Sequence, residues 1–251
     1  MTALRWIFPI FATFVLAAST ADTFAYGQPE CPGRVLDKHY FVICYSSGSK
    51  IPVWVGYVLT REDLSQKIAE RKNNFRPDRD LLRGERAELS DYAGSGFDRG
   101  HLAPAADFTR SKDAMSTSFL LSNMAPQVGG FNRGRWANLE EAIRDLVRAH
   151  GKVWVFTGSA FAGGRPLRSI GANQVAVPSH FYKAVLCVHG DDTKEMFGFI
   201  LPNTGQIGEK LAHFAHAVDF IETFAQLDFF GNLPRNEQRR LERGTNPLPP
   251  R

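Results

Sequence analysis

The chain has 251 residues, of which 43% are hydrophobic and 22% are charged. This is enough apolar material for one large domain or two small ones, and the composition excludes a globally disordered protein. The net charge of +4 and the pI of about 9.0 suit an anionic partner, although many basic proteins bind nothing acidic.

The first 21 residues have the organisation of a secretory signal peptide. A start containing Arg5 precedes an uncharged run at 6–21, and small residues at 17–21 would form the cleavage site, with a second site near Ala25. The run has 16 residues and contains Pro9, whereas a membrane-spanning helix needs about 20. We therefore expect a cleaved signal, a periplasmic or secreted protein, and no membrane contact afterwards.

The three cysteines suggest one disulfide and one free thiol. Export permits disulfides, and a bridge between Cys31 and Cys44 would close a short loop and add roughly 3 kcal/mol by the chain-entropy estimate. Cys187 lies in the apolar run 184–188, where a free cysteine behaves as a small core residue. The absence of a Cys-x-x-Cys pair argues against a cysteine zinc site.

One domain is predicted over residues 26–233, and its first part contains two strands. Residues 40–45 and 53–59 are rich in aromatic and β-branched residues, which favours strands joined by the Ser- and Gly-rich turn between them. Residues 61–71 have helical composition. The basic, proline-containing segment that follows, up to Arg86, is either a solvated loop or a phosphate-binding surface.

The centre of the chain is predicted to be irregular up to one amphipathic helix. Residues 94–106 are rich in Gly and Pro and cannot form a long regular element, and residues 111–122 contain a short helix or strand. Residues 129–134 are predicted to form a loop, after which a helix begins and continues to Gly151. Its apolar residues fall on one face at 3.6-residue spacing, namely Trp136, Leu139, Ile143, Leu146 and Val147.

Three further strands and a second helix are predicted beyond it. The strands are expected at 153–157, 176–188 and 196–201, and an amphipathic helix at 215–230. Residues 234–251 are polar, basic and Pro-rich at the end, which predicts a flexible tail. We expect a single α+β domain with a central antiparallel sheet flanked by helices.

Candidate catalytic residues are concentrated between residues 97 and 144. His101 ends an Asp-Arg-Gly-His motif, and a histidine has the unperturbed pKa, about 6.5, that suits proton abstraction from water. Asn132 offers a neutral oxygen, a ligand that magnesium accepts while it keeps most of its waters. Glu140 and Arg144 are four residues apart on the predicted helix and share a face, which can offer a carboxylate to a water on the metal and a guanidinium to a phosphate.

Each of these residues also has a structural interpretation. An isolated histidine is usually structural, and Asn132 alone would be an ordinary residue at a helix start. Glu140 and Arg144 are more often a surface ion pair of little energetic value. The ordered series and its spacing favour the catalytic interpretation.

The series resembles the DNA/RNA non-specific endonuclease family, whose fold is of the ββα-metal type. The resemblance runs from about residue 40 to about residue 230 and is strongest in order and spacing. It is carried by Asp98-Arg99-Gly100-His101, Ser122-Asn123, Pro126-Gln127, Asn132, Trp136, Leu139 and Glu140.

This resemblance implies a role for each matched residue. His101 matches the general base, Asn132 the direct protein ligand of magnesium, and Glu140 the acid that contacts a water on the metal. Arg99 would lie near the phosphate, and Asn123 is similar to an asparagine that supports the site. Two further arginines match phosphate-binding residues: Arg71, through a loosely patterned stretch, and Arg144.

The implied activity is metal-dependent hydrolysis of DNA and RNA with Mg²⁺, or with Mn²⁺ in its place. His101 would activate a water that attacks phosphorus in line, and the metal would stabilise the leaving 3′ oxygen, which gives 5′-phosphate products. A phosphate-directed site carries no base readout, and this favours tolerance of both nucleic acids. An exported non-catalytic nucleic-acid-binding protein and a phosphodiesterase for small esters are the alternatives. Members of the family can form homodimers, and no residue here decides the oligomeric state.

Overall fold

The computed structural model describes residues 20–166, 168–205, 210–246 and 248. Most of the predicted signal peptide, residues 1–19, lies outside these residues. Within the described part of the chain, no helix combines the length and the apolar character needed to cross a membrane.

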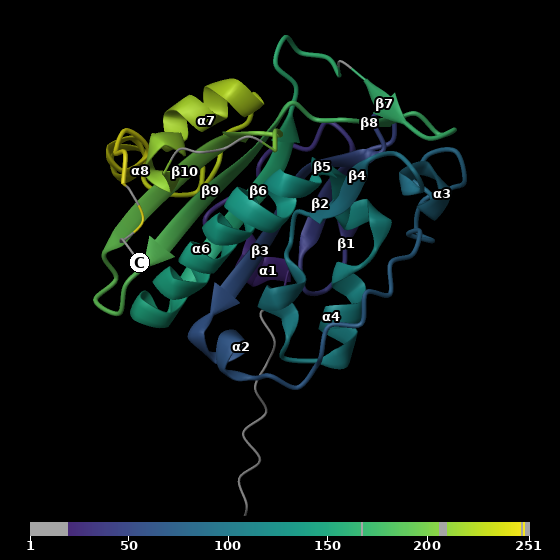
Figure 1. Ribbon diagram of the computed structural model, residues 1–251. Coiled ribbons are helices and arrows are strands. Elements are labelled where there is room, and N and C mark those ends of the chain that lie inside the picture. The colour runs from purple at the N-terminus through teal and green to yellow at the C-terminus, as the bar shows by residue number, and fades with distance from the viewer. Residues whose placement is uncertain (1–19, 167, 206–209, 247, 249–251) are drawn as a thin grey trace, which may run out of the picture.

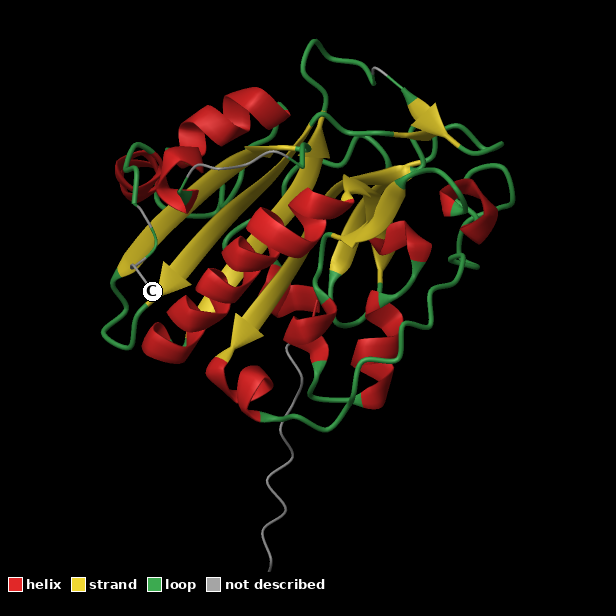
Figure 2. Ribbon diagram, viewed as in Figure 1, coloured by secondary structure: helices red, strands yellow, loops and turns green. Residues whose placement is uncertain are grey.

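A seven-stranded antiparallel sheet forms the centre of the molecule (Figures 1 and 2), as predicted. The five long predicted strands are all present, and each pairs with its neighbours over most of its length. In spatial order the strands are β1 (Arg34–Asp37), β2 (Val42–Ser46), β3 (Ile51–Thr60), β6 (Lys152–Ala160), β9 (His180–Val188), β10 (Lys194–Pro202) and β11 (Ala215–His216).

Both faces of this sheet are buried, so its central strands are almost continuously apolar. On one face, α6 (Ala137–His150) covers alternate residues of the central strands, and Leu139, Ile143 and Val147 pack into that core. On the other face pack α7 (Val218–Ala225) and α8 (Arg235–Glu242). The predicted apolar stripe of α6 is confirmed, and the helix ends at Gly151, whose φ of 106° suits glycine.

A second, two-stranded sheet lies beside the large one and carries the motif residues. It consists of β4 (Phe97–His101) and β5 (Met124–Val128), which pair antiparallel. The segment between them folds into η1 (Ala105–Phe108), α4 (Lys112–Ser118) and η2 (Leu121–Asn123). The remaining short elements are α1 (Thr20–Thr23), α2 (Arg61–Ser65), α3 (Leu89–Tyr92), β7 (Ser169–Ile170), β8 (Val175–Ala176) and η4 (Leu211–Phe214).

The helices predicted at 61–71 and 215–230 are shorter than expected. The first begins with a capping box of Thr60 and Asp63 but ends at Ser65. Beyond it, the backbone N–H groups of Ile68 and Ala69 donate to the carbonyl of Thr109 instead of to a helical partner. The second ends at Gln226, whose φ of 56° is left-handed. Some residues whose composition favours a helix are therefore non-helical, because they form tertiary hydrogen bonds or pair as β11.

The region expected as a flexible tail contains α8 instead. Leu241 is buried in the core of the second sheet face, and the side chain of Asn246 donates to the carbonyl of Met196 at 2.9 Å. Although the segment is mostly polar, two of its apolar side chains, Leu241 and Leu248, pack against the core.

The cysteine assignment is confirmed. Cys31 and Cys44 form a disulfide with their Cα atoms 5.5 Å apart, which fastens the arm before β1 to β2. Cys187 is a buried free thiol in the core strand β9.

Candidate active site

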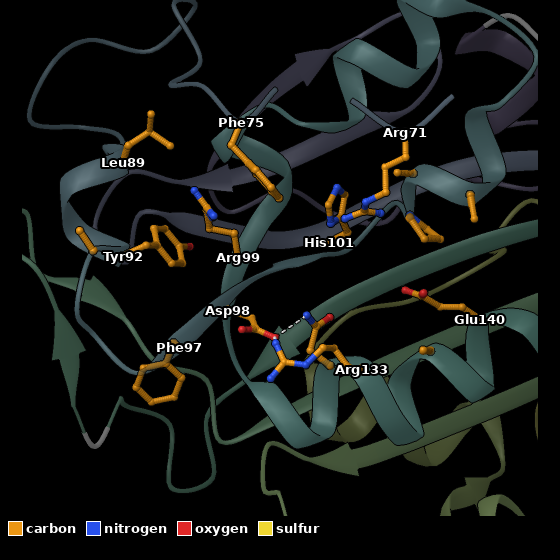
Figure 3. Close-up of a pocket in the computed structure, with 16 residues that line it drawn as sticks. Arg71, Phe75, Leu89, Tyr92, Phe97, Asp98, Arg99, His101, Arg133 and Glu140 are labelled. Carbon is orange, nitrogen blue, oxygen red and sulfur yellow. Dashed lines mark hydrogen bonds and ion pairs between the residues drawn. The ribbon is translucent and has the colours of Figure 1, made fainter. Parts of the chain in front are cut away.

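A cavity of about 610 Å³ gathers most of the predicted site residues (Figure 3). Its walls come from β4, from the loop at residues 71–75, from α3, from η1, and from the helical segment that follows β5. The predicted residues among its lining are Arg71, Arg99, His101, Asn132 and Glu140. Asn123 and Arg144 do not line it.

His101 is the last residue of β4 and lies opposite Met124 of β5. Gly100 permits this close pairing, because a Cβ at that position would overlap the side chain of Gln127. The indole nitrogen of Trp136 donates to the backbone carbonyl of His101 at 3.3 Å. The glycine of the motif and the tryptophan of the following helix thus fix the backbone of the histidine.

The imidazole of His101 is buried between two aromatic rings. It is 8% exposed, and its ring centroid lies 5.6 Å from that of Phe75 and 4.9 Å from that of Phe119. Within the described chain, its Nε2 is buried without a hydrogen-bond partner. Burial, and then the charges of Arg71 and Arg99, lower the pKa of His101 to about 3, so the ring is uncharged at neutral pH.

Asn132 lies in a helix and not in the loop predicted for residues 129–134. The helix begins with α5 (Gly129–Phe131) and continues as a π-helical turn, η3 (Asn132–Trp136), before α6 starts. Gly130 approaches the backbone of Gly205 closely enough that a Cβ would lie 3.2 Å from its Cα. Two glycines suggest a loop, but here they permit close packing. A π turn widens the helix locally and is frequent at functional sites.

Asp98 determines how the Asn132 amide is oriented. Nδ2 of Asn132 donates to Oδ2 of Asp98 at 2.9 Å, and Arg133 Nη1 lies 2.6 Å from the same oxygen. A carboxylate can only accept hydrogen bonds, so the amide nitrogen must face Asp98. The amide oxygen of Asn132 is thereby left for another ligand, and a neutral oxygen of this kind suits a hard cation.

Glu140 is the second oxygen donor at the cavity and points into it (Figure 3). Burial raises its pKa, and the nearby ammonium of Lys183 opposes that rise. Lys183 is fully buried beneath the site, where it donates to Thr157 Oγ1 at 3.2 Å and lies 4.6 Å from the Trp136 ring centroid. A buried cation thus compensates a carboxylate that faces the cavity.

Two arginines present positive charge to the cavity. The guanidinium of Arg99 lies 4.1 Å from the Phe75 ring centroid, and that of Arg71 lies 5.0 Å from the Phe119 centroid and donates to Asn73 Oδ1 at 2.8 Å. Figure 3 places Arg71 beside His101 and Arg99 on the other side of it. Arginines held on aromatic faces keep their donors available for a phosphate.

Arg144 does not take the position predicted for it. It is 7% exposed, and it donates from Nη1 to Asp107 Oδ1 at 2.8 Å and from Nη2 to Glu141 Oε2 at 2.7 Å. The four-residue spacing to Glu140 is real, but Asp107 of η1 draws the guanidinium into the protein interior. The structure therefore gives Arg144 a structural ion pair and no access to the cavity.

Asn123 lies outside the cavity and hydrogen-bonds to the backbone next to it. Its side chain is fully buried, accepts from the Ala103 backbone N–H at 2.9 Å, and donates to the carbonyls of Ala103 and Ser118 at 2.9 Å each. It thus holds the chain that leaves His101 and has no contact with the cavity. It is a positioning residue.

The sequence analysis gave no role to several residues that shape the cavity, among them Asp98, Arg133 and Phe75. The signal for Asp98 was its place in the motif. Nothing in the sequence shows that the segment containing Phe75 folds over His101.

Comparison with known proteins identifies relatives over most of the chain. Residues 19–236 match the family described as DNA/RNA non-specific endonuclease. A nuclease from Syncephalastrum racemosum is 38% identical over 93% of this chain and 78% of its own length. Human mitochondrial endonuclease G is 36% identical over 83% of this chain and 73% of its own length.

The comparisons contradict the predicted location. Several relatives, human endonuclease G among them, are named as mitochondrial. The expectation of a periplasmic or secreted protein rested on residues 1–21, nearly all outside the described part of the chain, and this assignment was wrong.

The fold agrees with the sequence comparison. A crystal structure of the EndoG/EndoGI complex, which concerns the mechanism of EndoG inhibition, superposes with a TM-score of 0.82 and 32% identity over 86% of this chain and 93% of that one. The ββα-metal fold expected from the resemblance is confirmed, with β4, β5 and the helical segment after β5 as its ββα unit. The chain belongs to the DNA/RNA non-specific endonuclease family.

Proposed function

We propose that this protein is a sugar-non-specific endonuclease that hydrolyses the phosphodiester bonds of DNA and RNA, with His101 as its general base. The observation that carries the proposal is the buried Nε2 of His101, which has no hydrogen-bond partner among the described residues and lies at a cavity also lined by Asn132 and Glu140. A protein that only binds nucleic acid needs no such group. A buried ring nitrogen without a partner is costly, and function is one reason for a protein to retain it.

The arginines beside His101 link substrate binding to proton transfer. In the free protein, their charges contribute to the low pKa of the imidazole. A phosphate bound by Arg71 and Arg99 would cancel much of that field, so the pKa of His101 would rise when substrate is present. The base would then be neutral before substrate binds and a better proton acceptor afterwards.

The residues at the cavity fit a divalent metal ion, and the family is one of metal-dependent nucleases. Asn132 would hold the ion through its amide oxygen, which the hydrogen bond to Asp98 leaves free, and Glu140 would hold one of its waters. Oxygen donors of this kind favour Mg²⁺, with Mn²⁺ as a substitute. When bound, such an ion stabilises the charge that develops on a leaving 3′ oxygen.

The proposed order of events uses the residues already described. Arg71 and Arg99 bind and orient the phosphate, and His101 takes a proton from a water that attacks phosphorus in line. The bond between phosphorus and the 3′ oxygen breaks, the 3′ oxygen takes up a proton from solvent, and the phosphate stays on the 5′ oxygen. Because all these contacts address the sugar-phosphate backbone, neither base identity nor the sugar is read directly.

Cleavage assays on three substrates test this function. Purified protein is incubated with supercoiled plasmid, single-stranded DNA and RNA, each with Mg²⁺, with Mn²⁺ or with excess chelator. We expect all three to be degraded to 5′-phosphorylated fragments, and chelation to stop the reaction. Binding without cleavage would support the non-catalytic alternative. Hydrolysis of a small phosphodiester, with nucleic acids left intact, would support the small-ester alternative.

A further inference from the structure

An arginine next to the cavity repeats the arrangement of the arginines that are proposed to bind phosphate. Arg168 lies directly before β7, and its guanidinium is 4.3 Å from the ring centroid of Phe97. Phe97 lines the candidate active-site cavity. The distance is close to the 4.1 Å between the guanidinium of Arg99 and the ring centroid of Phe75.

The guanidinium of Arg168 is available to a ligand. The residue is exposed, and no carboxylate of the described residues forms a salt bridge with it. An aromatic face restrains a guanidinium without using its N–H donors, so these donors can bind the oxygens of a phosphate. Arg168 therefore combines a defined position with a positive charge that no described carboxylate pairs.

The β7–β8 hairpin that follows Arg168 is fastened to the wall of the cavity. Asp91 of α3 is buried and accepts from Asn173 in the hairpin turn, through the backbone N–H at 3.0 Å and through Nδ2 at 3.1 and 2.9 Å. Figure 1 shows the hairpin beside α3. The carbonyl of Arg168 accepts from the backbone N–H of Val177 at 3.0 Å. Because α3 also contributes Tyr92 to the cavity lining, the hairpin and the cavity wall are directly connected.

The position of Phe97 on β4 separates Arg168 from the proposed base. Phe97 and His101 are four residues apart on β4, so they share a face of the strand, and their backbones are about 14 Å apart. Figure 3 shows Phe97 at the end of the cavity away from Arg71. Since one strand of duplex DNA rises about 3.4 Å per nucleotide, a phosphate at Arg168 and a phosphate at His101 belong to different nucleotides.

We propose that Arg168, held on the ring of Phe97, binds a backbone phosphate of the nucleic acid a few nucleotides away from the bond that is cut. The inference rests on the proposed nuclease function, and it extends the substrate-binding surface from the cavity to the β7–β8 hairpin. A strand of several nucleotides would then be bound better than an isolated phosphodiester. Because a phosphate carries no sequence information, the contact should raise the affinity equally for all sequences.

The salt dependence of DNA binding tests the proposal. Binding of a labelled duplex to the full-length protein is measured at increasing salt concentrations, in EDTA so that cleavage does not interfere. If Arg168 contacts one phosphate, Arg168→Met should lower the slope of log affinity against log salt concentration by about 0.9, and to the same extent on duplexes of unrelated sequence. Arg168→Lys, which keeps the charge, should retain the wild-type slope.

Two controls locate the effect. Arg235→Met makes the same charge change at an exposed position at the start of α8, on the sheet face opposite α6, and should keep the wild-type slope. The Arg99→Met, Arg168→Met double variant should lose about 1.8, because the two residues contact different phosphates. Arg168→Met should melt at the wild-type temperature, since Arg168 is exposed.

A wild-type slope in Arg168→Met would overturn the proposal, and so would an equal loss of slope in Arg235→Met. A lower melting temperature of Arg168→Met with an unchanged slope would mean that Arg168 only fastens the hairpin, which also overturns it. The proposed nuclease function is tested separately. Cleavage by the wild type together with an unchanged slope in Arg168→Met would refute this contact alone. A reduced slope in a protein that never cleaves would support the contact and refute the nuclease function.

Discussion

Replacing Arg144 by methionine should destabilise the protein without lowering its affinity for nucleic acid. Arg144 and Asp107 are 7% and 2% exposed, and their ion pair is 2.8 Å long. Methionine preserves much of the side-chain volume but leaves the Asp107 carboxylate buried without its cation. Burial already raises the pKa of Asp107, and Arg144 opposes that rise, so the loss of Arg144 would raise it further.

The cost can be estimated from similar buried pairs. Removing one partner of a buried ion pair typically costs about 3–5 kcal/mol. Tyr57 still donates to the other oxygen of Asp107 at 3.1 Å, so we expect the lower end, about 3 kcal/mol. For a chain of this size, each kcal/mol lowers the melting temperature by about 2–4 °C. The Arg144→Met variant should therefore melt about 6–12 °C lower.

Binding assays separate this role from phosphate contact. Each phosphate contact on duplex DNA contributes about 0.9 to the slope of log affinity against log salt concentration. In EDTA, which prevents cleavage, Arg144→Met should keep the wild-type slope, and Arg99→Met, the control at the cavity, should lose about 0.9 with little change in stability. The Arg144→Met, Asp107→Leu double variant should regain most of the stability. A reduced salt slope with unchanged melting in Arg144→Met would refute the structural role.

Three further predictions concern the cavity and the disulfide. Burial lowers the pKa of His101 from 6.5 to about 3, so as the pH falls the unfolded chain takes up a proton at this residue before the folded chain does. The free energy of unfolding should therefore fall by about 2 kcal/mol between pH 7 and pH 5. Urea titrations at the two pH values should show that the His101→Gln variant lacks this loss. Asp98→Ala removes the acceptor that orients Asn132, so calorimetric Mg²⁺ titration should show about 10–100-fold weaker binding. An unchanged affinity would exclude the orienting role. Cys44→Ser should cost roughly 3 kcal/mol of stability, and equal urea midpoints for variant and wild type would show that the bridge does not stabilise the fold.

The features that the sequence predicted correctly are those that local pattern determines. The central strands are long and apolar because both faces of the sheet are covered, and the stripe from Leu139 to Val147 follows the helical period. His101, Asn132 and Glu140, which the order and spacing of the motifs singled out, line one cavity. The pairing of Cys31 with Cys44 followed from their short separation.

The features it missed depend on contacts between distant segments. Arg144 is drawn inward by Asp107, 37 residues away, and no helical spacing reveals that partner. The two glycines at 129 and 130 favour a loop locally, yet Gly130 packs against Gly205 inside a helical start. Phe75 becomes part of the site only because the segment before β4 folds over His101.

In the proposed mechanism, His101 transfers the proton while Asn132 holds the metal. Cleavage of plasmid DNA and calorimetric Mg²⁺ titration are measured side by side for wild type, His101→Ala and Asn132→Ala. We predict that His101→Ala loses about 10²–10⁴-fold in cleavage rate but binds Mg²⁺ as wild type does, and that added imidazole restores part of its rate. Asn132→Ala should lose both cleavage and Mg²⁺ affinity, with no rescue by imidazole. Loss of Mg²⁺ binding in His101→Ala, with binding retained in Asn132→Ala, would contradict this assignment.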